Sequence, residues 1–522
     1  MKGGNIEALS ALGILMIASM AIGVYANRAQ EKGGGFLSGY FLGNRGLGSW
    51  SMALTATVMS GGTFMGFPSL VYSYGWVLAL WIASYMMVPL CTFVVLGKRI
   101  GQLSRQTGAI TLPDLLRERF ESPRLGLLAS IVMMLILTFG LVSQFKAGAI
   151  IMQLVLPPLP GIPDGAMYLN RSPQFLYGLL LFSIVVVGYT IHGGFLAAVW
   201  TDLFQSVLMA IGILILFPLA LIHSGGLERA TQAGIAAVGP GFAYAPGAER
   251  DFLTPGLAFS FFAMWSIAGM GQPATLVRLM AFSDTPTLRR ATFLLGAYNT
   301  VIYLPLVLIF ICARAVLPNL AQPDEVMPAM ALKVASPWIA GLILAAPFGA
   351  VMATISGFLV QISSGLVQDV YHRFFNPHAD EATLRRISNL TMVVVAIGAA
   401  VAAIFSPKFL QALIVFAGGC AACAFLVPAV MTAFWKQATA RSAMAAMAAG
   451  VLTMLALYVP GWVSNRDPGI GETSGFYPVY FMGVAPFVWG LVASIVVGVV
   501  VTVVAPGPSP SRVDEFFPET AG

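Results

Sequence analysis

"MGFP" at Met65–Pro68 and "MGQP" at Met270–Pro273 each place a glycine and a proline inside a long apolar stretch. Proline lacks the backbone N–H and clashes with the carbonyl four residues earlier, and glycine permits an unwound backbone. The residues before the motifs are also alike, with "SGGTF" before the first and "SIAG" before the second. The two motifs therefore predict interruptions of two helices, at Gly66 and Pro68 and at Gly271 and Pro273.

The composition around these motifs is that of a membrane protein. Of the 522 residues, 58% are hydrophobic and only 9% are charged, against roughly a quarter charged in an ordinary soluble domain. Apolar segments of about 20 residues, the length that crosses a bilayer as a helix, recur from end to end. No stretch between them is long enough for a soluble catalytic domain. The predicted fold class is an all-α integral membrane protein.

Hydropathy predicts about thirteen spans and an orientation. The gaps that fall on one side of the membrane hold about two thirds of the 27 lysines and arginines, so the positive-inside rule places the N-terminus outside and the C-terminus in the cytoplasm. The net charge of +6 then reflects topology, and nucleic-acid binding is not needed to explain it. The expected location is the inner (plasma) membrane. The predicted spans are 5–25, 50–73, 75–97, 125–156, 174–192, 200–222, 256–276, 289–315, 336–369, 387–406, 409–433, 442–459 and 479–504.

The two motifs lie in the second and seventh predicted spans, which cross the membrane in opposite directions. This pattern predicts two five-helix repeats of inverted topology, although a proline kink alone is common in membrane helices. In lipid, an opened backbone is tolerated only where it is buried in protein or lines a cavity, and there it can bind ions. The expected divisions are an N-terminal helix and loop (1–47), the first repeat (48–224), an external loop (225–255), the second repeat (256–434) and two peripheral helices with a tail (435–522).

Two ionisable residues fall clearly within the predicted spans, where charge is costly and marks a functional site by default. Asp202 lies near the cytoplasmic end of its span, where it can have a functional role, cap the helix that follows "HGG", or do both. Lys146 lies in the central to outer part of the fourth span, next to Gln144. Three interpretations of Lys146 stay open: it binds a substrate carboxylate, it takes part in ion coupling, or it snorkels to the surface. Asp202 and Lys146 are expected to be too distant to pair.

Several motifs, in the same order, resemble the sodium:solute symporter family over most of the chain. They include "YFLGNRGLGSWSMALTATVMSGGTFMGFP", "GAITLPDLLRERF", "GGFLAAVWTDLFQ", "GMGQPATLVRLMAFSD" and "APFGAVMATISGFLVQISSGLVQDVY". Within the family the chain is most similar to bacterial sodium/pantothenate and sodium/proline symporters. The resemblance implies a leucine-transporter-type fold of two inverted five-helix repeats, with unwound segments in the second and seventh helices.

The resemblance also implies a sodium site between the second and ninth spans. Its ligands would be the carbonyls of Ala56, Met59 and Ala350 and the hydroxyl of Thr354, a set that suits a hard cation. Ala353 stands where the family usually has serine, which removes one oxygen. Apart from the resemblance, Thr354 is equally a hydroxyl that bonds to its own helix. The family also implies that an acidic residue at the position of Asp202 assists sodium on the inner pathway.

Six residues are predicted to line the substrate site. Proline carriers have a tyrosine at the position of Gly269, so a larger cavity is expected here, compatible with a longer carboxylated or amide-containing solute such as pantothenate. Trp265 is equally a packing or lipid-facing aromatic. The predicted set is Lys146, Gln144, Trp265, Gly269, Gln272 and Pro273.

The sequence thus predicts a secondary active carrier that imports a small organic solute, such as a carboxylate, by sodium symport with alternating access. Proton-coupled or sodium-independent transport is the main alternative, and a channel or a membrane sensor is a more distant one. The expected partners are the solute, sodium ion and the lipid bilayer. No enzyme activity, cofactor, metal other than Na⁺, nucleic acid or obligate protein partner is expected.

Overall fold

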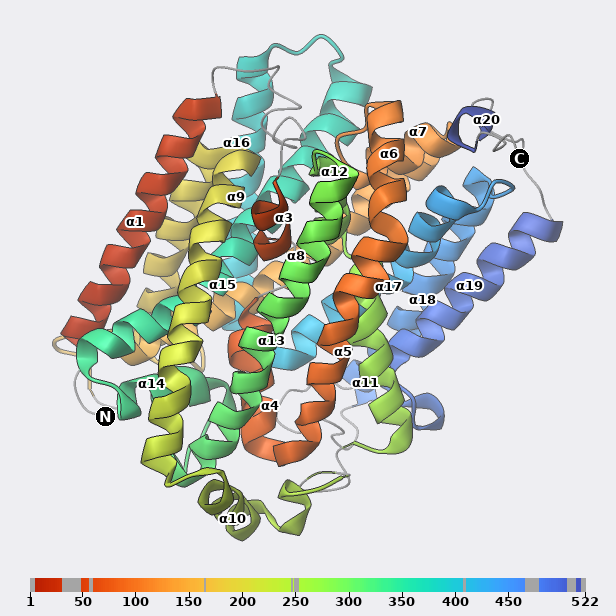
Figure 1. Cartoon of the computed structure of the whole chain (residues 1–522). Helices are drawn as coiled ribbons and strands as arrows, with labels where there is room; N and C mark the ends of the chain where they lie inside the picture. Colours follow the sequence, from red (N-terminus) through yellow and green to blue (C-terminus); the bar gives the residue numbers. More distant parts are fainter. Residues whose placement is uncertain are drawn as a thin grey trace.

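The computed structural model describes residues 5–30, 48–55, 60–163, 166–245, 247, 253–406, 410–464, 478–504 and 513–517. Within these residues the chain is almost entirely helical (Figure 1). In chain order the elements are α1 (Ile6–Gln30), α3 (Ser49–Thr55), η2 (Gly62–Gly66), α4 (Phe67–Tyr74), η3 (Gly75–Ala79), α5 (Leu80–Val88), η4 (Pro89–Gly97), α6 (Lys98–Thr107), α7 (Leu112–Phe120), α8 (Pro123–Val155), α9 (Pro173–Ser224), α10 (Leu227–Val238), η5 (Pro240–Phe242), α11 (Pro255–Ile267), η6 (Ala268–Gly271), α12 (Pro273–Ala281), α13 (Thr285–Val316), η7 (Pro323–Glu325), α14 (Val326–Val334), α15 (Pro337–Ser364), η8 (Gly365–Phe375), α16 (Glu381–Ile404), α17 (Leu410–Phe434), α18 (Ala440–Ser464), η9 (Phe481–Gly483), α19 (Pro486–Val504) and α20 (Val513–Phe516).

Among the described residues, 11 helical runs are long and apolar enough to cross a membrane. One of them, Gly62–Thr107, joins the second and third predicted spans in a single run of 46 residues. The seventh predicted span corresponds to a shorter apolar helix, Pro255–Gly271. The chain is therefore a multi-span helical membrane protein, and the figure of thirteen spans stays a prediction.

The joined run Gly62–Thr107 leaves the helical conformation at Gly75, and Figure 1 shows the chain turning back between α4 and α5. Gly75 has φ 85°, and a Cβ there would lie 2.1 Å from the carbonyl oxygen of Phe242. Only glycine combines that backbone conformation with so close an approach. Phe242 is fully buried and follows α10, a helix that lies in the stretch predicted as an external loop.

α9 covers the fifth and sixth predicted spans in one continuous helix of 52 residues. This is more than twice the length that one crossing requires. Its two apolar segments, Pro173–Ile191 and Ala198–Ser224, lie on either side of the "HGG" sequence. The helix backbone therefore continues through a position where the sequence predicted a turn.

Two of the long helices begin directly after a serine that caps them. The Ser122 and Ser172 side chains accept hydrogen bonds from the N–H groups of Leu125 and Phe175, and proline follows each serine. A hydroxyl N-cap satisfies a free N–H, and proline in the first turn costs no hydrogen bond. These caps fix where α8 and α9 begin, and so set the register of the buried residues farther along them.

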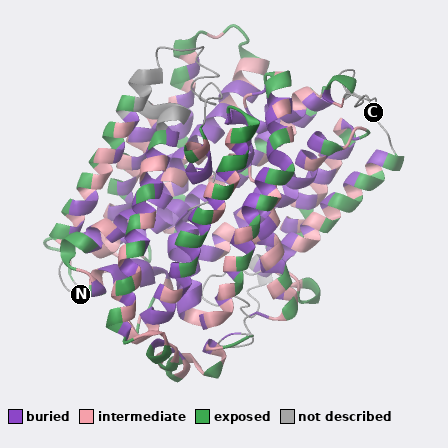
Figure 2. Cartoon of the chain, in the orientation of Figure 1, coloured by how far each residue is buried: buried purple, intermediate pink, exposed green. Residues whose placement is uncertain are grey.

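Burial separates central from peripheral helices (Figure 2). In the most apolar windows of the α15 and α17 runs, 78% of residues are buried, against 28% in α1 and α19. Large apolar side chains on the outside, such as Val394 and Ile397 of α16, stay exposed. An apolar exterior of this kind suits lipid contact, so α15 and α17 form the centre on which the other helices pack.

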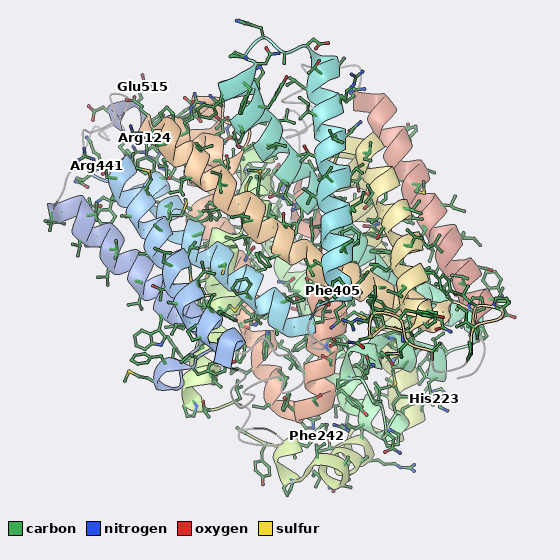
Figure 3. The ribbon with its side chains drawn as sticks, turned by 180° about the vertical axis from the view of Figure 1, so that it is seen from behind. Arg124, His223, Phe242, Phe405, Arg441 and Glu515 are labelled. Carbon is green, nitrogen blue, oxygen red and sulfur yellow. The ribbon has the colours of Figure 1, made fainter. Side chains whose placement is uncertain are left out.

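A short C-terminal helix, α20, covers the end of the molecule at which Arg124, Arg441 and Glu515 lie, opposite His223 and Phe242 (Figure 3). Phe516 is fully buried, and its carbonyl accepts a hydrogen bond from the Arg99 guanidinium.

Arg119, also fully buried, lies 5.0 Å from the Phe517 ring centroid and donates to the Trp435 carbonyl. Burial, together with the like charge of Arg99, lowers the pKa of Arg119 to about 10. The aromatic rings therefore cover a cation that is still protonated at neutral pH.

Candidate functional site

The described chain leaves the helical conformation at Ser60, before the predicted position, and residues 56–59 lie outside the described residues. α3 ends at Thr55 and η2 begins at Gly62, with Ser60 in a bend before it. Gly66 has helical backbone angles, and Pro68 occupies the first turn of α4, where its missing N–H is not needed. The predicted interruption at Gly66 and Pro68 is wrong, because these residues mark the change from a π-helix to an α-helix.

The second interruption falls within the "MGQP" sequence. α11 ends at Ile267, η6 is a short 3₁₀ turn, Gln272 has extended backbone angles (φ −79°, ψ 117°), and α12 begins at Pro273. The side-chain nitrogen of Gln272 donates to the Gly418 carbonyl of α17 at 3.1 Å. A Cβ on Gly271 would lie 2.7 Å from the Cα of Ala422, so the turn is pressed directly against α17. The opened backbone is therefore buried within protein.

The segment that follows the first interruption is held by α8 and α13. The Gly61 N–H donates to the Gln144 side-chain oxygen at 2.8 Å, and the Gln144 side-chain nitrogen donates to Ser143 at 3.0 Å. A Cβ on Gly61 would lie 2.8 Å from Ala147, which explains the glycine. On the other side, the Thr63 hydroxyl lies 3.2 Å from the Tyr303 hydroxyl. Gln144 therefore positions the backbone of this segment.

Aromatic rings connect the two interrupted helices. Trp265 stacks on Tyr85 with ring centroids 5.5 Å apart, and Tyr85 stacks on Tyr303 at 3.8 Å. The Trp265 indole N–H has no hydrogen-bond partner among the described residues. A Cβ on Gly269 would lie 2.7 Å from the Thr92 hydroxyl, which also has no partner in the described part of the chain. Both unpaired polar groups are therefore close to the second interruption: Trp265 belongs to α11, and Thr92 lies beside Gly269 of η6.

The two described sodium-ligand candidates of α15 lie one turn apart. Ala350 is fully buried, and the Thr354 hydroxyl donates to its carbonyl oxygen at 2.9 Å. Within α15 the same carbonyl also accepts the backbone N–H of Thr354, so both lone pairs are used and a cation binding here would have to displace the hydroxyl donor. Ala353 is half-buried and accepts from the Ser356 hydroxyl through its carbonyl. The other predicted ligands, Ala56 and Met59, lie outside the described residues.

Asp202 belongs to a buried ion pair. Its carboxylate lies 3.0 Å from the Arg278 guanidinium of α12, which also donates to the Thr55 hydroxyl at 3.3 Å. Only 3% of Asp202 is exposed. The capping interpretation is wrong, because α9 is continuous through this residue and its N-cap is Ser172. Asp202 instead connects α9, through Arg278, to the end of α3.

Lys146 also has a buried partner. Its ammonium lies 3.1 Å from the Asp324 carboxylate of η7, and the two side chains are 2% and 4% exposed. The snorkelling interpretation is therefore wrong, since a snorkelling lysine keeps its ammonium in water. The same Asp324 oxygen accepts a hydrogen bond from the Leu410 N–H at 2.9 Å. In the described part of the chain, Lys146 and Asp202 thus belong to two different ion pairs.

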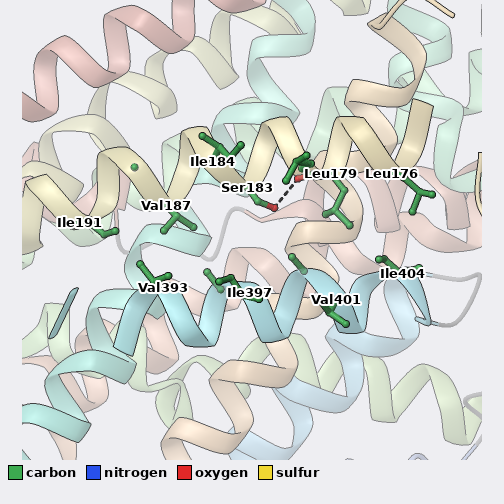
Figure 4. Close-up of a pocket in the computed structure, with 14 residues that line it drawn as sticks. Leu176, Leu179, Ser183, Ile184, Val187, Ile191, Val393, Ile397, Val401 and Ile404 are labelled. Carbon is green, nitrogen blue, oxygen red and sulfur yellow. Dashed lines mark hydrogen bonds between the residues drawn. The ribbon is translucent and has the colours of Figure 1, made fainter. Parts of the chain in front are cut away.

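An apolar groove of about 560 Å³ lies between α9 and α16, and its lining includes none of the charged residues described above (Figure 4). Its one hydroxyl, on Ser183, donates to the Leu179 carbonyl of its own helix. A groove without a free polar group does not fit a carboxylated solute. Among the described residues, unpaired polar groups are instead found beside the second interruption, at Trp265 and Thr92. The groove is lined by Leu176, Leu179, Leu180, Ser183, Ile184, Val187, Gly188, Ile191, Val393, Ala396, Ile397, Ala400, Val401 and Ile404.

The sequence did not identify the two ion-pair partners, Arg278 and Asp324. Arg278 follows the second interruption inside the apolar run "TLVRLMAF", and this context was a usable signal for a buried charge. Asp324 lies in the polar sequence "AQPDEV", which reads as a surface loop. Its partner is 178 residues away, so no local pattern indicates that it is buried.

Comparisons with known proteins agree with this architecture. The model of the sodium:solute symporter family matches residues 40–450. The chain is 32% identical over 452 residues to the sodium/pantothenate symporter of Escherichia coli K12, covering 85% of this chain and 89% of that protein. It is 31% identical over 443 residues to a sodium/proline symporter of Haemophilus influenzae, covering 80% and 82% respectively.

A solved structure supports the fold. A Na⁺-coupled sialic acid symporter, in a substrate-bound outward-open state, matches with a TM-score of 0.71 and covers 97% of this chain and 99% of that one. The sequence identity is 20%, so the match bears on the fold alone.

Proposed function

Because the chain belongs to the sodium:solute symporter family, we propose that it imports a small carboxylated solute, with pantothenate as the first candidate. Membership makes the protein a sodium-coupled solute transporter in the membrane rather than an enzyme. The observation that carries the carboxylate is Lys146, a fully buried ammonium two residues from the glutamine that holds Gly61. A buried cation inside a membrane bundle requires an anionic partner. Asp324 is that partner in this structure, and a solute carboxylate is the same kind of group and can take its place.

In the proposed cycle, sodium binds between the first interruption and α15, through Ala56, Met59, Ala350 and Thr354. The bound cation fixes the segment around Gly61, and the solute then binds between Lys146, Gln144 and the turn at Gly269–Pro273, with Trp265 alongside. The two repeats rock to open inward, and sodium leaves past Asp202. The contact of Arg278 with both Asp202 and Thr55 supports this exit route, because Thr55 directly precedes Ala56.

Uptake by the purified protein in proteoliposomes tests this function. We expect saturable uptake of labelled pantothenate when a sodium gradient is imposed, and little uptake with a pH gradient alone. Proline and short monocarboxylates, measured in parallel, rank the solute classes. Uptake driven by pH alone would overturn sodium coupling, and flux that does not saturate would indicate a channel.

Restoring the hydroxyl at position 353 tests the sodium site. We expect Ala353→Ser to lower the sodium concentration for half-maximal uptake several-fold, because it adds an oxygen ligand for a hard cation beside Thr354. Ala353→Cys is the matched control, since sulfur is of similar size and a poor sodium ligand. Equal effects of the two variants would show that size, rather than ligation, matters at this position.

A further inference from the structure

The Lys146–Asp324 pair connects the core of the bundle to an outer segment. Lys146 lies on α8, whereas Asp324 lies on η7, immediately before α14. η7 and α14 pack on η2 and α4, the elements that follow the first interruption. Most of α14 is buried, including Met327 and Met330, so the segment Pro323–Val334, here named the outer segment, is part of the packed structure. It therefore lies beside η2, the helical segment that begins directly after Gly61.

Asp324 is only partly satisfied in this position. One carboxylate oxygen accepts from both Lys146 and the Leu410 N–H, whereas the other has no hydrogen-bond partner among the described residues. Gln411, next to Leu410, points its side-chain oxygen toward Gly66, and that oxygen also has no partner in the described chain. Unpaired buried oxygens cost free energy. The hydrogen-bonding capacity of Asp324 is therefore only partly used where the outer segment lies in this structure.

Other charges nearby do not replace Asp324. Arg171 is the neighbouring cation, and it repels the Lys146 ammonium. The Arg171 guanidinium donates to the carbonyls of Ile404 and Ser406, at the end of α16. Glu325, beside Asp324, has no ion pair among the described residues. If Asp324 withdraws, the buried ammonium therefore needs another anion, because an unpaired buried charge costs several kcal/mol.

We propose that Asp324 is a tethered carboxylate that competes with the solute's carboxylate for the ammonium of Lys146. This inference rests on the proposed function. When the outer segment is withdrawn, the solute carboxylate occupies Lys146. When the solute moves on, Asp324 takes its place and the outer segment closes. Lys146 is neutralised in both arrangements, so each exchange keeps the buried charge paired.

The competition has a measurable effect on affinity. If a competing group leaves a site unoccupied for only a fraction of the time, the apparent dissociation constant of the ligand equals the intrinsic one divided by that fraction. If Asp324 occupies Lys146 for about nine tenths of the time, Asp324→Asn raises the apparent affinity for pantothenate about tenfold. The same change slows maximal transport, because the closed arrangement then leaves Lys146 without its anion. Tighter binding with slower turnover is the expected signature.

Binding and uptake are measured with pantothenate and with its uncharged alcohol analogue. We expect Asp324→Asn to bind pantothenate more tightly and the alcohol unchanged. We expect Lys146→Met to lose affinity for pantothenate by about thirtyfold or more, again with little change for the alcohol. Glu325→Gln is the matched control, since it is the same kind of substitution on the neighbouring residue, and we expect it to leave both affinities unchanged.

The double variant Lys146→Met with Asp324→Asn separates competition from a purely structural pair. A structural pair predicts that removing both charges restores pantothenate binding and uptake. Competition predicts that the double variant keeps the low pantothenate affinity of Lys146→Met. Unchanged pantothenate affinity in folded Asp324→Asn would also overturn the proposal.

A second measurement does not depend on the folding of Asp324→Asn. In Glu325→Cys, we expect pantothenate, but not the alcohol, to speed labelling by a membrane-impermeant thiol reagent, because the bound carboxylate keeps the outer segment open. Wild-type protein supplies the background from its own four cysteines. Equal labelling with both solutes would contradict the competition. If wild-type protein takes up no carboxylated solute under a sodium gradient, the proposed function itself fails, and this inference fails with it.

Discussion

Replacing Arg278 with methionine is expected to reduce sodium-driven uptake by at least about a hundredfold. The substitution keeps an apolar stem of similar length but removes the cation that lies 3.0 Å from Asp202. Breaking a buried ion pair from one side costs about 3–5 kcal/mol, because it leaves an uncompensated charge. It also removes the contact that connects Thr55 to Asp202. Uptake into proteoliposomes, together with the yield of folded protein on size-exclusion chromatography, measures both effects.

The control and the double variant distinguish stability from transport. Arg289→Met changes an exposed arginine on α13, and we expect uptake close to that of the wild type. Asp202→Asn combined with Arg278→Met removes both charges, so the folded yield should recover. If Asp202 assists sodium, sodium-driven uptake of this double variant stays low. Full recovery of uptake would show that the pair has only a structural role.

Gly271→Ala is the second change with a large expected effect. The added Cβ would meet the backbone of α17, at 2.7 Å from the Ala422 Cα and 2.9 Å from the Leu426 nitrogen. Backbone atoms cannot rotate away as a side chain can, so η6 or α17 must shift. Such overpacking typically costs about 1–3 kcal/mol, and here it displaces the turn that carries Gln272. We expect uptake to fall about a hundredfold.

Gly296→Ala provides the matched comparison for that variant. Gly296 lies within α13, and a Cβ there meets nothing within 4 Å. Alanine favours a helix over glycine by about 1 kcal/mol, so the control should be as stable as the wild type or slightly more stable, with unchanged uptake. If Gly271→Ala behaved like Gly296→Ala, α17 would not constrain the turn at the second interruption.

The non-helical backbone at Gln272 lies inside the "MGQP" sequence, whereas the described chain leaves the helical conformation at Ser60, before "MGFP". At Gln272 the extended backbone stands directly before a proline that starts a helix, and both features are local. At Pro68 the proline lies in the first turn of a helix that is already under way through a π-helical segment. Proline is compatible with a first turn as well as with a break. The letters "MGFP" and "MGQP" therefore do not distinguish the two situations.

For the charged residues, too, the local sequence predicts only part of what the structure shows. Lys146 and Asp202 were recognised because each is a charge within an apolar run, which is a local feature. Their partners could not be assigned, because Asp324 and Arg278 lie 178 and 76 residues away. The "HGG" sequence suggested a helix start near Asp202, yet α9 is one continuous helix from Pro173 to Ser224. Long-range packing decided each of these points.

The packing of α20 implies an order of events during biosynthesis. Phe516, whose carbonyl accepts from Arg99 and whose ring lies over Arg119, follows Arg99 by 417 residues. At about 5–20 residues per second, a ribosome needs roughly 20–80 s to make that stretch. Throughout this interval both arginines wait without their aromatic cover, while the helices between them and the tail enter the membrane. The face that α20 covers can thus mature only after residues 513–517 have been made, and a nascent chain stalled before residue 513 would leave both arginines uncovered.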